Sequence, residues 1–287
     1  MSVTLSFPSQ VKAGTSISGG ERELEVSVSS GDQVEVTVDN NLEFLLYPDF
    51  DFTQLDLLLF LEAQDDSTVT KTGDQVSTWL DTSGLSNDAT GDSDGGVLKP
   101  IFSGIGNNAK IKFTGNALNE EFFNLDSHVA NFNIHDGGSI TMVAEIESAS
   151  SQYSLGWSVG TYGIYIRIDD GSVTYTFNDS SSFSTFSPVY ETPKNIGDTV
   201  VLTLTHNGIQ EIKSRTDLET EDTADSSGFA KWWSLEGGTV DEFRIGQDPA
   251  SGNYGLISFK QIICTTDYLT SEQITDLHTH LLGKYNR

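Results

Sequence analysis

Four aspartates lie close together in the sequence and carry side chains that can coordinate a metal ion. Asp81, Asp88, Asp92 and Asp94 fall within fourteen residues, and carboxylate oxygens are the ligands that Ca²⁺ prefers. The run Asp92-Ser93-Asp94-Gly95 is similar to the start of an EF-hand loop, but the later ligands and the distal glutamate are missing. In a chain with 42 acidic residues, such a cluster also arises by chance. Two interpretations stay open: a calcium site, or a loop stabilised by hydrogen bonds from these side chains to the backbone.

Aromatic rings are the residues with which this chain could bind a sugar. The flat apolar face of a ring matches the C–H face of a pyranose. Trp232 and Trp233 are adjacent, so on a strand one side chain faces the core and the other faces outward. Tyr165 alternates with isoleucines and is predicted to face away from the core, close to Arg167. We predict a glycan-binding site at these four residues, with packing in the core or at an interface as the alternative for each ring.

Residues for acid–base or nucleophilic catalysis form no recognisable pattern in the sequence. His278 and His280 are two apart in a predicted helix, about 200° around its axis, so they cannot share a metal ion. Cys264 is the single cysteine, which excludes intramolecular disulfides, and its apolar neighbours predict a buried, inert thiol. No nucleophile-elbow serine and no glycine-rich phosphate loop occurs. The sequence therefore predicts a protein that is not an enzyme.

Strands with period-2 alternation are predicted to position these side chains. Apolar residues alternate with polar ones over 164–168 and again over 173–177, and Asp170-Gly171 between them is a turn signal. The apolar run Leu55–Leu61 has the length of a strand that is buried on both faces. Strands of this kind, with a turn about every eight to twelve residues, predict an all-β sandwich or jelly roll.

One amphipathic helix is predicted close to the C-terminus. Thr270 is a suitable N-cap and Gln273 lies at the third helical position, which together form a capping box. Four apolar side chains recur at helical spacing and form a single stripe: Ile274, Leu277, Leu281 and Leu282. Gly283 is predicted to end the helix. The one-sided stripe indicates that the helix packs against the sandwich.

Residues 1–48 are predicted to form a small β-rich module, and residues 49–287 the jelly-roll domain. Alternation over 23–38, with turn residues at 29–32, predicts a β-hairpin within the first module. The boundary is placed near Tyr47-Pro48, because the residue before a proline is disfavoured in a helix. We predict that the small module serves as an anchor.

The composition narrows the class of partner. With 15 basic and 42 acidic residues the formal charge is −27, which repels nucleic acid and disfavours an anionic membrane surface. No run of about 18 apolar residues occurs, so no membrane-spanning helix is predicted. The N-terminus has neither the basic start nor the apolar stretch of a secretory signal peptide. We expect either that a signal was removed or that the protein is finished inside the cell that makes it.

Several motifs resemble laminin-G-like domains of the concanavalin A-like lectin/glucanase superfamily. The resemblance begins with these runs in the first half of the chain: 61–63, 76–84, 87–90, 99–100 and 111–115. It continues with these runs near the C-terminus: 243–246, 255–257, 269–273 and 281–285. Over about residues 55–287 it implies a concanavalin A-like jelly-roll sandwich with a short C-terminal helix. The physical role expected for Trp79 in these motifs is packing at the edge of the core.

The resemblance also defines a catalytic pattern that can be sought. Retaining glucanases of this superfamily carry Glu-x-Asp-x-x-Glu on one strand, with both glutamates directed into the cleft. Glu145 and Glu147 lie on one face of a predicted strand, but the middle aspartate and the last glutamate are absent. Glycosidase activity is therefore not expected.

Two functions agree with these features. The first is a virion structural protein of the phage type, a capsid decoration or fibre subunit, whose N-terminal module contacts capsid or tail proteins and whose lectin-like domain binds host glycans. Such a subunit can form a homo-oligomer, and its acidity would keep particles mutually repelling. The alternative is a secreted bacterial adhesin or carbohydrate-binding module in the extracellular space or on the cell surface. For both functions, calcium is the one candidate cofactor.

Overall fold

The computed structural model describes most of the chain beyond residue 49. The described ranges are 50–92, 99–115, 121–149, 152–159, 162–178, 183–225, 241–247 and 255–285, together with the backbone of four strands nearer the N-terminus. Residue contacts divide the chain into two units, Met1–Leu46 and Tyr47–Arg287. No helix in the described ranges is long and apolar enough to span a membrane.

The first unit contains four short strands in two antiparallel pairs. These are β1 (Ser2–Ser6), β2 (Thr15–Ser18), β3 (Glu21–Leu24) and β4 (Gln33–Thr37). Strand β1 pairs with β4, and β2 pairs with β3. The predicted hairpin over 23–38 is therefore wrong in its pairing. Only Gly19-Gly20 separates β2 from β3, and this dipeptide is a strong signal for a two-residue hairpin.

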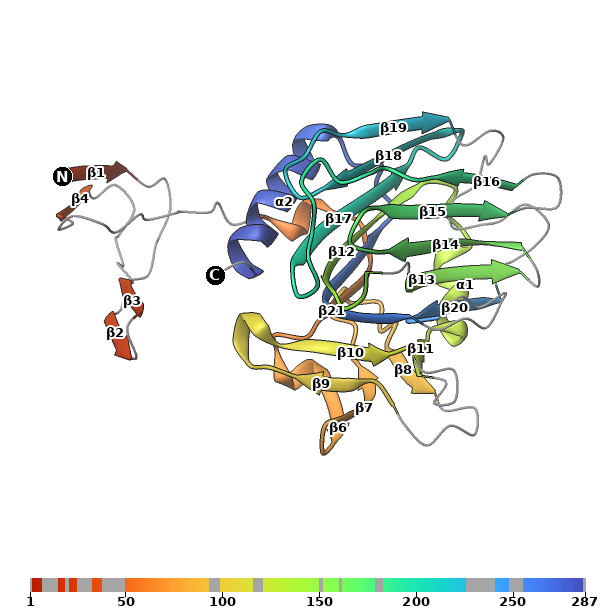
Figure 1. Cartoon of the computed structure of the whole chain (residues 1–287), viewed down its shortest axis with the longest axis horizontal. Helices are drawn as coiled ribbons and strands as arrows, with labels where there is room; N and C mark the ends of the chain where they lie inside the picture. Colours follow the sequence, from red (N-terminus) through yellow and green to blue (C-terminus); the bar gives the residue numbers. More distant parts are fainter. Residues whose placement is uncertain are drawn as a thin grey trace. The chain divides into compact units, whose positions relative to one another are not determined.

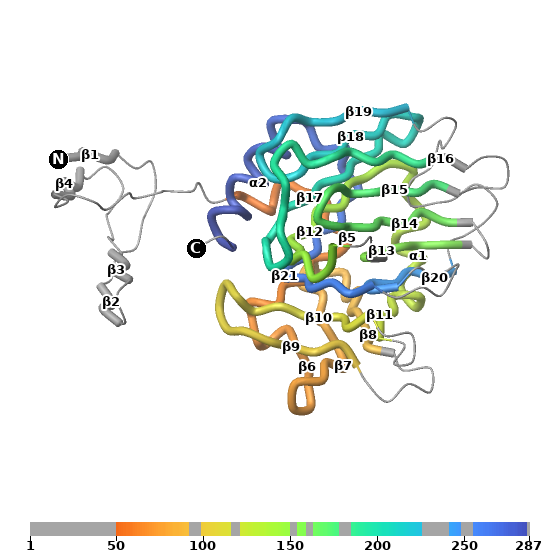
Figure 2. The backbone as a smooth tube through the Cα atoms, viewed as in Figure 1, coloured from red at the N-terminus to blue at the C-terminus, as the bar shows by residue number. Residues whose placement is uncertain are grey.

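The second unit is a jelly-roll sandwich of two antiparallel sheets, which we call sheet A and sheet B (Figure 1). The order of sheet A is β9 (Ile101–Ser103), β10 (Lys110–Thr114), β21 (Leu256–Thr265), β12 (Gly138–Ile146), β17 (Thr199–His206), β18 (Glu211–Thr216) and β19 (Asp222–Asp225). Strand β5 (Leu57–Glu62) pairs with the C-terminal half of β21, and β10 pairs with its N-terminal half. Figure 2 shows how the late strand β21 lies beside early strands of the same unit.

Sheet B forms the other layer. Its order is β16 (Phe183–Phe186), β15 (Val173–Asn178), β14 (Tyr162–Ile168), β13 (Gln152–Val159), β20 (Glu242–Ile245), β11 (Phe122–Asn124), β8 (Ala89–Asp92), β7 (Gln75–Trp79) and β6 (Val69–Thr72). A pairing of Gln75 in β7 with Ile101 in β9 joins the two sheets at one edge. The connections carry short helices: η1 (Phe52–Gln54), η2 (Asp66–Thr68), η3 (Gly106–Asn108), η4 (Asp126–His128) and α1 (Val129–Phe132).

The main apolar core lies between the two sheets, as the alternation predicts. Ile164, Ile166 and Ile168 of β14 point into it, and Trp79 is fully buried there at 0% exposure. Strand β5 is buried on both faces, because Leu59 belongs to this core while its neighbour Phe60 packs on a second cluster outside sheet A. These predictions from the sequence are confirmed.

Helix α2 (Ser271–Tyr285) covers part of the outer face of sheet A and builds the second cluster. The capping box is present: the Thr270 N–H donates to Gln273 Oε1 at 3.0 Å, and the Gln273 N–H donates to Thr270 Oγ1 at 3.2 Å. The predicted stop at Gly283 is wrong. That glycine is buried inside the helix, and the last turn is held by the Tyr285 hydroxyl, which donates to Gln261 Oε1 at 2.9 Å.

Candidate functional site

The loop after β7 is organised around the carboxylate of Asp81. Its Oδ1 accepts hydrogen bonds from the N–H groups of Phe60 at 2.8 Å and Ser83 at 2.9 Å. Its Oδ2 accepts from the Ser83 hydroxyl at 2.6 Å and from the Asn87 N–H at 2.9 Å. Asp88 Oδ1 in turn accepts from the Asp81 N–H at 2.8 Å. Both aspartates therefore serve as acceptors for the loop, as the second interpretation of this cluster predicts.

The side chains of the other two aspartates of the predicted calcium site lie outside the described residues. Asp92 ends β8, but its side chain and the whole of Asp94 lie outside the described residues. Among the side chains that the structure describes, no group of three His, Cys, Asp or Glu residues is arranged to hold a metal ion. The calcium site predicted at Asp81, Asp88, Asp92 and Asp94 therefore stays a prediction.

A row of side chains crosses the outer face of sheet B and includes one predicted glycan-binding residue. Tyr165 lies opposite Thr176 on one side and Gly156 on the other. Gly156 lies opposite Arg244, which lies opposite Asn124. Five neighbouring strands thus contribute to one line. Gly156 has no side chain between the tyrosine and the arginine, and it is buried in the described structure.

Tyr165 and Arg167 lie on the predicted face, but they are less accessible than a stacking platform requires. Tyr165 is only 6% exposed, and a Cβ atom on Gly163 would lie 2.4 Å from its hydroxyl oxygen. The ring therefore lies along its own strand over Gly163. Arg167 is half-buried, and its Nη2 donates to Thr176 Oγ1 at 3.5 Å. The other two predicted residues, Trp232 and Trp233, lie outside the described residues.

Arg244 is a site residue that sequence reasoning missed. Its Nη2 contacts Glu242 Oε1 at 2.9 Å, and its Nη1 donates to Gln247 Oε1 at 2.6 Å. The guanidinium lies over the ring of Phe122, 4.6 Å from the centroid. Its Nε is buried and has no hydrogen-bond partner among the described residues. The alternation Glu242–Ile245 could have placed Glu242 and Arg244 on one face, but the partner strands that form the row could not be predicted.

Asp126 lies beside this row and adds a half-buried carboxyl group. It accepts a hydrogen bond from the Phe243 N–H at 2.7 Å. Burial raises the pKa of the Asp126 carboxyl above its usual value, and this effect outweighs the opposing influence of that hydrogen bond and of Arg244.

Glu145 and Glu147, the nearest approach to a catalytic pair in the sequence, are held in ion pairs on the outer face of sheet A. Lys110 contacts both glutamates, Lys112 lies 2.6 Å from Glu147 Oε2, and the Ser258 hydroxyl donates to Glu147 Oε1 at 2.5 Å. Burial tends to raise the pKa of Glu147, but the hydrogen bonds from Lys112 and Ser258 and the charge of Lys110 hold it below its usual value. These ion pairs and hydrogen bonds join neighbouring strands of sheet A, which is a structural role.

Two of the remaining candidates are buried in the described structure. The Cys264 thiol is fully buried, and burial raises its pKa well above its usual value, in agreement with the predicted inert thiol. His278 is enclosed between α2 and sheet A, whereas His280 Nδ1 accepts a hydrogen bond from the Phe50 N–H at 3.2 Å. The two histidines thus face different partners, as their spacing predicts.

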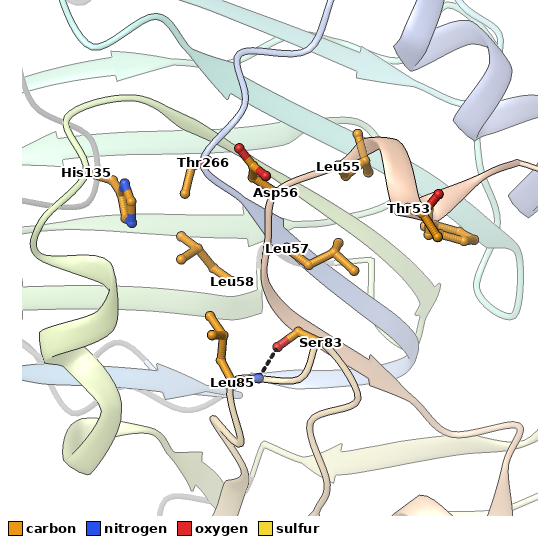
Figure 3. A pocket seen from close by; sticks show the side chains of 10 residues that line it. Thr53, Leu55, Asp56, Leu57, Leu58, Ser83, Leu85, His135 and Thr266 are labelled. Atoms are coloured by element: carbon orange, nitrogen blue, oxygen red, sulfur yellow. Dashed lines mark hydrogen bonds between the residues drawn. The ribbon is translucent and has the colours of Figure 1, made fainter.

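A cleft of about 520 Å³ lies near the start of β5 (Figure 3). Its apolar side chains are Phe52, Leu55, Leu57, Leu58 and Leu85, and its polar ones are Thr53, Asp56, Ser83, His135 and Thr266. Figure 3 shows His135, from the loop after α1, on one side of the cleft. The sequence did not predict this cleft, because segments far apart in the chain build it.

The comparisons with known proteins identify a shared fold. No protein-family model and no curated protein matches the chain. The receptor-binding domain of the botulinum neurotoxin C/D mosaic serotype is 14% identical with a TM-score of 0.53, over 78% of this chain and 51% of that chain. The present chain thus spans about half the length of the toxin domain. At this identity the likeness shows the fold alone, and it confirms the predicted jelly-roll sandwich.

Two further solved structures have lower scores. The CBM40 module of the Ruminococcus gnavus IT-sialidase, bound to α2,3-sialyllactose, is 16% identical with a TM-score of 0.47, over 55% of this chain and 91% of that chain. The NanB sialidase from Streptococcus pneumoniae is 10% identical with a TM-score of 0.48, over 57% of this chain and 27% of that chain.

Proposed function

We propose that the chain is a non-enzymatic, lectin-like protein that binds a glycan on the outer face of sheet B. The observation that carries the proposal is the guanidinium of Arg244, which Glu242, Gln247 and Phe122 hold in place on this face, opposite Gly156. Donors that are already ordered lose little conformational entropy when a ligand binds. A guanidinium donates in pairs to a carboxylate or to neighbouring hydroxyl groups, which are the polar groups of sugars.

The neighbouring groups in the row support this role. Arg167 contributes a second guanidinium on the same face of β14, next to the buried ring of Tyr165. Asn124 adds an amide on the far side of Arg244. A few converging polar groups beside aromatic surface are typical of sites that bind small polar ligands. The toxin domain that shares this fold is named for receptor binding, which is a precedent for recognition on a jelly roll.

The test is a glycan array probed with the full chain, containing neutral sugars and carboxylated sugars such as sialyllactose. We expect a defined set of glycans to bind, and Arg244→Gln to weaken their binding by about tenfold or more, since hydrogen bonds to charged groups contribute about 1.5–3 kcal/mol. The matched control is Arg215→Gln in sheet A, whose side chain bonds Thr275 at 2.6 Å. The proposal fails if no glycan binds, or if the two variants lose affinity equally.

We also propose the setting in which this binding is used: residues 1–48 anchor the protein to a capsid or tail, and the jelly roll is displayed to host glycans. The division of the chain into Met1–Leu46 and Tyr47–Arg287 supports an anchor that is separate from the binding domain. Immunogold electron microscopy on the native source tests it. Gold on virus particles is the expected result, and gold on cell envelopes alone would favour the adhesin.

A further inference from the structure

The cleft of Figure 3 is lined by five apolar side chains, and two of its hydroxyl groups already donate within the protein. The Ser83 hydroxyl donates to Asp81 Oδ2 at 2.6 Å and accepts from the Leu85 N–H at 3.2 Å. The Thr53 hydroxyl donates to Asp51 Oδ1 at 2.6 Å. These two hydroxyls are already engaged within the protein, so they offer little to the hydroxyl groups of a sugar. The five apolar side chains of the cleft instead suit an apolar group.

The charges at the cleft are negative. Asp56 lines it, is exposed, and its carboxylate has no hydrogen-bond or ion-pair partner among the described residues. Asp267 is close by, because its Oδ2 accepts the Asp56 N–H at 2.7 Å, and Asp51 adjoins the rim through Thr53. The residues that line the described cleft include no lysine or arginine. A positively charged group would therefore be attracted to this place, in a chain whose net charge is −27.

Two exposed apolar side chains belong to the cleft or are next to one of its residues in the sequence. Leu85 is 47% exposed, and Ile134, next to His135 in the chain, is 77% exposed. Exposed apolar side chains gathered around a concave site are typical of surfaces that contact another protein. A small ligand confined to the cleft would leave Ile134 uncovered, whereas a protein partner can cover it.

We propose that this cleft is a docking site for a partner protein, which inserts an apolar side chain flanked by lysine or arginine. The apolar side chain packs on Leu57, Leu58 and Leu85, and the basic neighbour pairs with Asp56. This site is separate from the glycan-binding face, since it is built from η1, the start of β5 and the loops that carry Ser83, His135 and Thr266.

The test follows the amide NMR signals of the isotope-labelled full chain as a peptide is added at low salt. The probe is acetyl-Arg-Leu-Phe-Lys-amide, compared with acetyl-Glu-Leu-Phe-Glu-amide and acetyl-Arg-Ser-Ser-Lys-amide. We expect the first peptide alone to shift the signals of Ser83, Leu85 and His135. Asp56→Asn preserves the size of the side chain and is expected to weaken binding by about threefold. Leu85→Gln changes an exposed side chain and is expected to weaken it by about tenfold.

The matched control is Asp74→Asn, which removes an exposed carboxylate in the turn between β6 and β7 and is expected to leave the affinity unchanged. A shift of the same signals by the acidic or the serine peptide, at equal affinity, would overturn the proposal. Signal shifts confined to other residues, or an equal loss of affinity in the Asp74 variant, would also overturn it. The same holds if no signal shifts at about 10 mM peptide, since contacts of this kind give affinities on the order of millimolar. Spectra of the variants without peptide verify that each is folded.

Discussion

At the scale of single residues, Asp81 explains how the loop after β7 keeps one conformation. Its two carboxylate oxygens receive four donors from Phe60, Ser83 and Asn87. Asn87 extends the network, because its side-chain amide donates to the Leu58 carbonyl at 2.6 Å and its Oδ1 accepts from Asn131 at 2.6 Å. One carboxylate thus links β5 to the loop that forms a wall of the cleft. Its role is to stabilise that wall.

Replacing Asp81 by asparagine should test this role. An amide has one acceptor oxygen and would present N–H groups to at least one of the present donors, leaving it unsatisfied. We expect the free energy of unfolding to fall by about 1–3 kcal/mol, measured by urea denaturation, with Asp74→Asn as an exposed control. If calcium raised the stability of the wild type and not of this variant, Asp81 would be a metal ligand and the account of the loop would be incorrect.

His278 is the second residue whose environment makes a measurable prediction. Its Nε2 lies 2.8 Å from the Thr203 hydroxyl, and its Nδ1 bonds the Asp217 carbonyl. Nδ1 must therefore donate, because a carbonyl only accepts, and in the neutral ring Nε2 accepts from the Thr203 hydroxyl. Burial lowers the pKa of His278 to about 4 from its ordinary 6.5.

Because the folded pKa of His278 lies below the unfolded one, its contribution to stability is complete above about pH 6.5 and is lost as the pH falls toward 4. Between pH 7 and pH 4.5 this loss amounts to about 2 kcal/mol. The His278→Gln variant can retain both hydrogen bonds. We expect its unfolding free energy, measured by denaturation, to fall by about 2 kcal/mol less than that of the wild type between pH 7 and pH 4.5. Parallel curves for the variant and the wild type would contradict the assignment.

At the scale of elements, α2 shows which predictions a sequence supports and which it does not. The capping box and the apolar stripe are local patterns, and both are found as predicted. The end of the helix depends on Tyr285 and Gln261, which are 24 residues apart, so a local signal such as Gly283 does not predict it. The same limit applies to β4, whose partner β1 lies far away in the chain, whereas the pairing of β3 with β2 is signalled locally by Gly19-Gly20.

The candidate site was predictable to a similar extent. Tyr165 and Arg167 were placed on the correct face, because alternation along one strand decides which way a side chain points. Their alignment with Gly156 and Arg244 depends on the register of three strands. Register of that kind is set by tertiary packing and is not encoded in any local pattern.

The cap of α2 should be testable on its own. Thr270→Ala removes the side-chain acceptor for the Gln273 N–H, and we expect a loss of about 1 kcal/mol in unfolding free energy. Thr270→Ser retains the acceptor and should restore most of the stability. Equal stability of the alanine and serine variants in thermal unfolding would mean that α2 is held by packing alone.

At the scale of the whole molecule, the jelly roll presents two separate candidate surfaces. The row through Tyr165 and Arg244 belongs to sheet B, whereas the cleft at Asp56 is built around the start of β5 in sheet A. A net charge of −27 surrounds both, so binding at either place should depend on salt, with a screening length of about 10 Å at 0.1 M. Variants of one surface should leave binding at the other unchanged, which makes the two proposals separable.

The most direct test of the central claim is a crystal structure of the full chain with a glycan selected from the array. The account predicts a sugar on the outer face of sheet B, with hydroxyl or carboxylate oxygens within hydrogen-bonding distance of the Arg244 guanidinium. A sugar bound in the cleft beside Asp56 and Leu85, or at the loops with the Arg244 face unchanged, would contradict it.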